Sequence, residues 1–189
     1  MSVLEIIRMG HPVLRRVAAP VADPTGPEIR ELIAGMKAAL AAAPGVGLAA
    51  PQVAVASRVI LYRVPPERAS GTPDDTPLDT SALINPVLEP LEEDELAFGW
   101  EGCLSIPGLR GLVPRYRRVR YRGLDADGKP VEGIAGGFHA RVLQHEVDHL
   151  DGVLYLDRMP DLAFLTFDEE MAHFTEEQME TLLARTHNK

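Results

Sequence analysis

Apolar side chains recur every three or four residues in the first quarter of the chain, a spacing typical of a helix with one buried face. The residues are Ile29, Leu32, Ile33, Met36 and Leu40. Pro27 suits the first turn of such a helix, and Pro44-Gly45 would end it. The spacing therefore predicts an amphipathic helix over residues 28–43.

A second helical pattern begins after Gly136-Gly137 and ends at Gly152. One face of this helix is aliphatic and consists of Leu143, Val147, Leu150 and Leu154. His145 and His149 are four residues apart, so they lie about one turn from each other on a different face. A helix with aliphatic residues on one side and reactive residues on the other is expected to be central and buried.

Shorter runs of β-branched and aromatic residues predict strands. They are residues 58–64, residues 82–88, and a hairpin in which residues 117–125 pair with residues 129–135. Asn85-Pro86 inside the second run indicates an edge strand or a bulge. We therefore expect an α+β fold in which antiparallel or mixed β-sheets pack around the central helix.

The remaining segments carry weaker patterns. Residues 65–80 are rich in Pro, Asp and Thr, which predicts a surface loop and carries no mechanistic signal. A partial apolar stripe of Met171, Phe174, Met179 and Leu182 predicts a C-terminal helix over about 168–186. Because no linker or repeat interrupts the chain, we expect one domain over residues 1–189.

Composition restricts the class of protein. The 189 residues are 46% hydrophobic and 25% charged, as in one ordinary globular domain. No apolar run approaches the roughly 20 residues of a transmembrane helix, and the N-terminus lacks the features of a signal peptide. The only cysteine, Cys103, excludes an internal disulfide and is typical of a reducing compartment. These features predict a cytoplasmic protein that does not associate with a membrane.

The charge pattern argues against a nucleic-acid site. The formal net charge is −9, although residues 115–122 contain five arginines. In a strand, Arg118, Arg120 and Arg122 would all point to one side, while the apolar residues between them point to the other. We therefore interpret the arginine-rich segment as the solvated face of a strand.

The sequence His145-Glu146-x-x-His149 places two imidazoles and a carboxylate on one rigid helix. This spacing is typical of metal hydrolases, in which the histidines bind the ion and the glutamate acts as a base. The third ligand distinguishes three alternatives. A histidine would be needed six residues after His149 in one metallopeptidase class, but Tyr155 stands there.

Two candidates for the third ligand remain open. Glu169 follows His149 by twenty residues, a spacing that a second metallopeptidase class uses. Its place at the acidic start of a predicted helix has a simpler explanation in the helix dipole. Cys103 would instead supply an upstream thiolate, which suits Zn²⁺ or Fe²⁺.

Three segments together resemble the signature motifs of the peptide deformylase family. In chain order they are residues 45–52 (GVGLAAPQ), residues 101–105 (EGCLS) and residues 144–150 (QHEVDHL). The resemblance extends over about residues 1–159 and is to type I enzymes. Residues 107–111 and 137–141 are similar to the organelle-type branch. Residues 160–189 carry no motif, and we expect them to be a helical extension.

The resemblance implies an enzyme that removes the formyl group from the N-terminal formylmethionine of new polypeptides and releases formate. Cys103, His145 and His149 would bind the metal, and hydroxide on the metal would attack the formyl carbon with Glu146 as general base and acid. The Gln52 amide and the Leu104 backbone N–H would face the oxyanion. The alternative is a metalloendopeptidase with Glu169 as third ligand.

The resemblance further implies Fe²⁺ in the cell, with Zn²⁺, Ni²⁺ or Co²⁺ able to replace it. Its partners would be nascent formylmethionyl peptides and, as a further candidate, the ribosome, in the bacterial cytoplasm. We predict substrate contacts at Gly45, Val46, Gly47, Gly102, Phe138, Arg141 and Val142, with Arg141 near the rim of the pocket. Around the metal ligands we expect Glu101 to orient a histidine and Asp148 to form an ion pair with Arg115.

Overall fold

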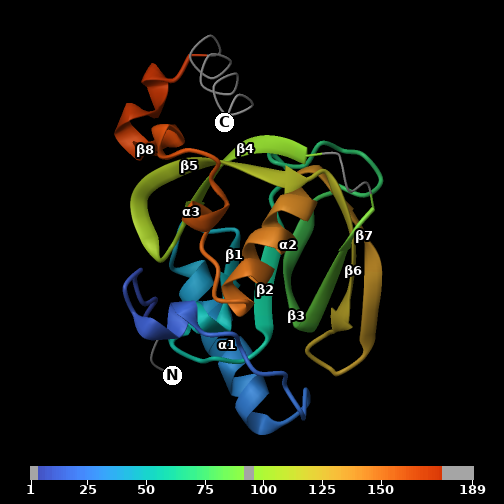
Figure 1. Ribbon diagram of the computed structural model, residues 1–189. Helices are drawn as coiled ribbons and strands as arrows, with labels where there is room; N and C mark the ends of the chain where they lie inside the picture. Colours follow the sequence, from blue (N-terminus) through green and yellow to red (C-terminus); the bar gives the residue numbers. More distant parts are fainter. Residues whose placement is uncertain (1–3, 92–95, 176–189) are drawn as a thin grey trace.

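A computed structural model describes residues 4–91 and 96–175 of the chain (Figure 1). The described part contains two long helices, eight strands and several short helical turns. In chain order the elements are η1 (Pro12–Arg15), α1 (Pro27–Ala41), β1 (Gly47–Ala49), η2 (Ala50–Val53), β2 (Val59–Val64), β3 (Leu78–Pro90), β4 (Leu96–Cys103), β5 (Ile106–Tyr116), β6 (Arg118–Leu124), β7 (Pro130–Gly136), α2 (Gly137–Leu150), α3 (Tyr155–Arg158), η3 (Leu162–Phe164), β8 (Leu165–Phe167) and η4 (Asp168–His173).

The strands form two antiparallel sheets, and α2 lies between them at the centre of the molecule (Figure 1). The larger sheet has the order β1-β2-β3-β6-β7, and the smaller has the order β4-β5-β8. One face of α2 packs Val142, Leu143 and Leu150 against Ile60 and Leu83 of the larger sheet. The expected α+β fold around a central helix is confirmed.

Helix α1 covers a second apolar cluster on the other side of β1 and β2. Ile29, Ile33, Met36 and Leu40 of this helix are buried together with Leu48 and Leu61 of the two strands. The predicted helix over residues 28–43 is therefore confirmed, with Pro27 as its first residue. Its packing fixes the loop that follows it, which enters β1 and then η2.

Strand β3 decides between the two alternatives for Asn85-Pro86, an edge strand or a bulge, in favour of the bulge. It pairs with β2 on one side and β6 on the other, so it is not an edge strand. A bulge between Ile84 and Val87 accommodates Asn85, whose φ is 52°. The Asn85 side chain bonds to the backbone N–H and C=O of Val21, at 2.8 and 2.9 Å. Asparagine tolerates this conformation, and its amide uses the space that the bulge opens.

The hairpin of β4 and β5 was not predicted. Pro107, Gly108, Gly111 and Pro114 interrupt the alternation in β5, although it is 11 residues long. Such residues usually mark turns, so the sequence pattern does not predict a strand here. Pairing with β4 on one side and β8 on the other stabilises β5 in spite of them.

The end of the described chain differs from the expected helical extension. Strand β8 adds to the smaller sheet by pairing with β5, and Phe164 just before it is fully buried. Residues 168–173 form the 3-10 helix η4 rather than the start of an α-helix. Residues 176–186 of the predicted helix lie outside the described residues. The segment from 162 to 167 is thus part of the packed fold.

The loop of residues 65–80 holds the start of α2. The Asp75 carboxylate accepts hydrogen bonds from the backbone N–H groups of Ser70, Phe138 and His139, at 3.0, 3.3 and 3.1 Å. The last two groups belong to the first turn of α2, which has no other acceptor within the helix. Gly137 has a φ of 50°, and a Cβ on it would lie 2.4 Å from the carboxylate. The glycine pair therefore allows Asp75 to cap α2.

We predict that Asp75→Ala lowers the free energy of unfolding by about 1 kcal/mol at neutral pH, as expected for a lost cap. Burial raises the pKa of Asp75, but the N–H donors of Ser70, His139 and Phe138 lower it by more. A carboxyl with a depressed pKa in the folded state stabilises the fold above its unfolded pKa of about 3.9 and loses this effect at lower pH. Denaturation of both proteins at several pH values measures the difference between them.

The difference between wild type and Asp75→Ala should be largest at neutral pH and should shrink below about pH 4. Asp79→Asn is the control, because Asp79 is exposed in β3. A difference that stays constant as the pH falls would contradict the role of the ionised cap.

Candidate active site

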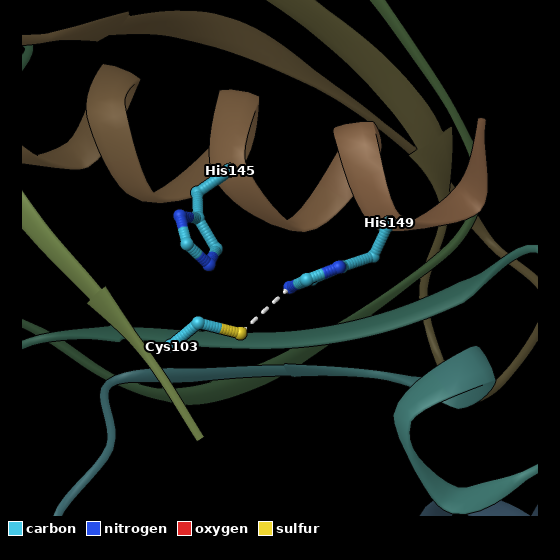
Figure 2. A group of neighbouring side chains, drawn as sticks. All are labelled: Cys103, His145 and His149. Atoms are coloured by element: carbon cyan, nitrogen blue, oxygen red, sulfur yellow. Dashed lines mark hydrogen bonds between the residues drawn. The ribbon is translucent and has the colours of Figure 1, made fainter. Parts of the chain in front are cut away.

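A cluster of three metal-binding side chains lies between α2 and the end of β4. His145 and His149 project from α2, and Cys103 approaches them from the facing strand (Figure 2). The three ligand atoms all lie within 4.8 Å of one another, and Cys103 Sγ is 3.3 Å from His149 Nε2. One thiolate and two imidazoles are donors that suit Zn²⁺ and Fe²⁺. The three predicted ligands are thus brought together.

Local structure explains how residues so distant in the sequence meet. The two histidines share a face because they are one turn apart in α2. Cys103 is the last residue of β4 and pairs with Ile106, so a tight turn of Leu104 and Ser105 follows it. Leu104 is not part of the register of the two strands, and it lines the cavity directly after the Cys103 ligand.

Glu146 lies next to the histidines and is 4% exposed. Its Oε1 faces Gly47, where a built Cβ would lie only 2.1 Å away, so that position has room for glycine alone. Its Oε2 has no hydrogen-bond partner among the described residues. Burial raises the pKa of this carboxyl to about 7. A carboxylate in this state can exchange a proton with a molecule in the cavity.

Gln52 comes from η2, directly after β1, and is 2% exposed. Its Oε1 accepts a hydrogen bond of 2.8 Å from the backbone N–H of Ala49. This bond turns the amide nitrogen toward Ser105 Oγ at 3.2 Å and Cys103 Sγ at 3.4 Å. The Gln52 donor therefore points toward the metal-binding cluster, on the same side as the Leu104 turn.

A buried ionic network supports the cluster from behind. Arg115 donates two hydrogen bonds to Glu101, each of 2.9 Å, and Arg141 donates one of 2.8 Å. Glu101 Oε2 also lies 2.8 Å from His145 Nδ1. Burial raises the pKa of Glu101, but the His145 and Arg115 bonds lower it by more, so the net shift is downward. Glu101 thus orients the His145 ring with Nε2 toward the other ligands.

Asp148 of α2 continues this network through Arg115. It forms the predicted ion pair with Arg115, and Arg158 of α3 binds it as well, at 2.7 Å. Asp148 is 6% exposed, so both arginines approach a carboxylate that is largely withdrawn from water. The network therefore links α2, α3 and β5 directly behind the metal-binding cluster.

A cavity of about 300 Å³ opens in front of the cluster. Most of the predicted substrate contacts line it, together with the reactive groups. The predicted residues in its wall are Val46, Gly47, Gln52, Gly102, Leu104, Phe138, Arg141 and Val142. Gly45 is not among them, because it packs against the side chain of Leu104.

The wall also contains residues that no sequence pattern indicated, among them Arg68, Trp100 and Arg110. The Arg68 guanidinium lies 4.1 Å from the centre of the Phe138 ring, as in a cation–π contact. Arg68 belongs to the loop of residues 65–80. The loop, whose composition carries no mechanistic signal, therefore contributes one residue to the wall of the cavity.

The expectation that Arg141 lies at the rim is wrong. Its side chain is 13% exposed and turns toward the hairpin of β4 and β5 instead of toward solvent. The guanidinium bonds to Glu101 and to backbone carbonyls of both strands. Arg141 is part of the cavity wall, and hydrogen bonds to the hairpin hold its guanidinium in place.

The alternative third ligand is contradicted. Glu169 lies in η4, is exposed, and is not part of the cluster. Its neighbour Asp168 binds Arg110 at 2.6 Å at the edge of the cavity. A metalloendopeptidase site with Glu169 as a ligand therefore does not form in this fold.

Three sulfur and nitrogen donors, a buried carboxylate and an amide donor around one cavity are the arrangement of a metal-dependent hydrolase. The chain belongs to the polypeptide deformylase family, whose model matches residues 3–164. The match includes every residue of the cluster and of the network behind it.

Individual relatives agree with this family. The chain is 52% identical to peptide deformylase 1 of Bordetella pertussis over 164 residues, which are 87% of this chain and 92% of that protein. It is 48% identical to peptide deformylase 2 of Ralstonia nicotianae, over 87% of this chain and 91% of that one. The likeness to the organelle-type branch stays a prediction.

Solved structures show the same fold. The class I type b peptide deformylase of Acinetobacter baumannii with bound Met-Ala-Ser superimposes with a TM-score of 0.73 at 38% identity, covering 84% of this chain and 99% of that one. The peptide deformylase of Ehrlichia chaffeensis in complex with actinonin gives a TM-score of 0.77 at 33% identity, covering 84% of this chain and 90% of that one.

Within residues 4–91 and 96–175, no helix is both long and apolar enough to cross a membrane.

Proposed function

We propose that this chain removes the formyl group from the N-terminal formylmethionine of new polypeptides and releases formate. The observation that carries the proposal is the Cys103, His145 and His149 cluster with the buried Glu146 beside it, at the end of one cavity. The family of the chain supports the same reaction.

Cys103, His145 and His149 would hold one divalent metal ion. The donor set fits such an ion, because the Glu101 bond to His145 Nδ1 leaves Nε2 directed at the other two ligand atoms. When bound, the ion supplies Lewis acidity, which lowers the pKa of a coordinated water from about 15.7 toward about 7 and polarises a carbonyl.

Glu146 would move the proton in this reaction. Its Oε2 has no partner among the described residues, so it can take the proton of the attacking water and pass it to the departing amine. The formyl C–N bond breaks as the amine gains this proton, and formate and a free N-terminus are the products. The carboxylate occupies the space that Gly47 leaves free by having no side chain.

The formyl oxygen would gain negative charge as water adds to the carbon. Gln52 Nε2 and the Leu104 backbone N–H would donate hydrogen bonds to it. Gln52 is well suited to this role because its own oxygen is held by Ala49, so the amide does not need to reorganise during the reaction. Gly102 and the backbone around Val46 would pair with the extended peptide.

The methionine side chain would occupy the apolar part of the cavity. Val46, Phe138 and Val142 line it, and the flexible thioether fits a slot of this kind. We further propose that residues 1–189 form one catalytic domain that acts on nascent chains in the bacterial cytoplasm, with the ribosome as a candidate partner.

We propose Fe²⁺ as the metal in the cell, with Zn²⁺, Ni²⁺ or Co²⁺ able to replace it. Ferrous iron and a thiolate ligand can both be oxidised. Protein purified without oxygen should therefore be more active than protein purified in air, and its iron content should be higher. Formate release and metal content measured on both preparations test this. Equal activity in the two preparations would contradict an iron enzyme.

The proposed function is tested by the products formed from formyl-Met-Ala-Ser. We expect formate and Met-Ala-Ser in equal amounts, with the peptide bonds intact. Acetyl-Met-Ala-Ser is the matched control and should react far more slowly, since its methyl group replaces the formyl hydrogen and crowds the carbon that the water must attack. Cleavage of internal peptide bonds without formate release would contradict the proposal.

A further inference from the structure

Arg141 joins the two elements that carry the metal-binding residues. It lies in α2, one turn before His145, and its side chain reaches across to the hairpin that ends in Cys103. Arg141 Nη1 donates to Glu101 at 2.8 Å and to the carbonyl of Val113 at 2.9 Å, and Nη2 donates to the carbonyl of Ala97 at 2.6 Å. One side chain therefore ties α2 to both β4 and β5.

The residues around the Arg141 guanidinium leave space for it and compensate its charge. At Gly99 of β4 a built Cβ would lie 2.8 Å from the guanidinium carbon of Arg141, so a larger residue there would displace the arginine. The charge is compensated by Glu101, and the side chain is largely buried. A buried arginine with a charged partner and two strong carbonyl acceptors is held in one geometry.

The contacts of Arg141 connect α2 and β4, which belong to different layers of the fold. Strand β4 pairs only with β5 in the smaller sheet, whereas α2 packs on the larger sheet. Cys103 and the two histidines are consequently carried by different layers of the fold. A shift of one layer relative to the other would separate the sulfur from the imidazoles.

We propose that Arg141 is a positioning residue, which fixes β4 and its Cys103 against α2 and its two histidines, and that it is not a contact for the substrate. This inference rests on the proposed function for its link to catalysis. Arg115 makes a second tie, because it reaches from β5 to Glu101 and to Asp148 of α2. Loss of Arg141 should therefore loosen the metal site without unfolding the protein.

The test compares Arg141→Met and Arg141→Lys with wild type. Arg58→Met is the matched control, since Arg58 binds Asp151 just after α2 at 2.7 Å and touches neither Glu101 nor β4. For each protein loaded with Zn²⁺, transfer of the metal to a chelator is measured together with kcat and KM for formyl-Met-Ala-Ser. Thermal unfolding is recorded on the same samples.

Arg141→Met should weaken metal retention and lower kcat by about tenfold each, as is common when a group that supports a ligand is lost. The KM should change by less than about twofold, because uniform substrate binding is not removed. Arg141→Lys keeps the charge and one donor, so it should lie between Arg141→Met and wild type. Arg58→Met should match wild type in all three quantities.

A raised KM with unchanged kcat and metal retention would overturn the inference and make Arg141 a substrate contact. Equal metal retention in wild type and both variants would overturn it as well. If Arg141→Met does not fold, Arg141→Lys decides between the two outcomes. If wild type releases no formate, the proposed function fails. The comparison of metal transfer to the chelator still tests whether Arg141 fixes β4 against α2.

Discussion

Replacing Glu146 by glutamine is expected to lower the rate of deformylation by about 10²–10⁴ while metal binding and folding are kept. Glutamine has the shape of glutamate and fits beside Gly47, but its amide cannot take a proton from water and return it to the amine. The loss should fall on kcat, because Glu146 acts on the proton and does not hold the peptide. Stopped assays of formate release with measured metal content would record the change.

The stability of Glu146→Gln serves as an internal control. Burial of an ionised group without a partner is unfavourable, so the neutral amide should not lower the thermal midpoint. Glu31→Gln, at an exposed site in α1, is the matched surface change and should behave as wild type. Activity near the wild-type level in a metal-loaded Glu146→Gln protein would remove Glu146 from the mechanism.

The second large effect concerns the third ligand. Cys103→Ser should lose most of its metal, because a hydroxyl is a much poorer ligand for Zn²⁺ or Fe²⁺ than a thiolate. Formate release should fall by more than the about 10–100-fold that the loss of an outer-shell partner costs. Glu169→Ala should leave both the metal content and the activity unchanged, since Glu169 is exposed and outside the cluster.

These two variants separate the deformylase from the metalloendopeptidase. Metal content and formate release are measured on both proteins purified in parallel. If Glu169→Ala loses the metal while Cys103→Ser retains it, the assignment of the cluster is wrong. Thermal unfolding of metal-free samples shows whether a loss of metal follows from a folding defect.

The elements with a strong period were predictable from the sequence. Helix α2 was found with its two histidines because side chains four residues apart share a face, and this holds whatever surrounds the helix. The hairpin of β6 and β7 was found from its alternation and its Asp-Gly turn. In such segments local spacing alone determines which groups lie together.

The hairpin of β4 and β5 was not predictable in this way, and it carries Cys103. Its glycines and prolines serve the packing, as Gly99 does by admitting the Arg141 guanidinium. The chemistry of its thiolate made Cys103 one of two open candidates for the third ligand, and the resemblance of residues 101–105 to a family motif favoured it. A strand that depends on tertiary contacts leaves little trace in the local pattern.

Long side chains were the other source of error. The position of Arg141 one turn before His145 determines the face of α2 on which it lies, but not the direction in which its flexible side chain points. It was expected at the rim, but its guanidinium turns toward the hairpin of β4 and β5, where Glu101 and two carbonyls accept its hydrogen bonds. Arg68 and Asp75 come from a loop whose composition indicated only turns, and their contacts with α2 arise from the fold.

The most direct test of the central claim is formate release from formyl-Met-Ala-Ser as a function of the metal bound to the same sample. Metal-free protein would be titrated anaerobically with Fe²⁺ and, separately, with Zn²⁺, and the bound metal counted at each point. The cluster of Cys103, His145 and His149 predicts that activity rises in proportion to bound metal and stops rising at one ion per chain. Formate release by the metal-free protein, or none by the fully loaded protein, would contradict the account.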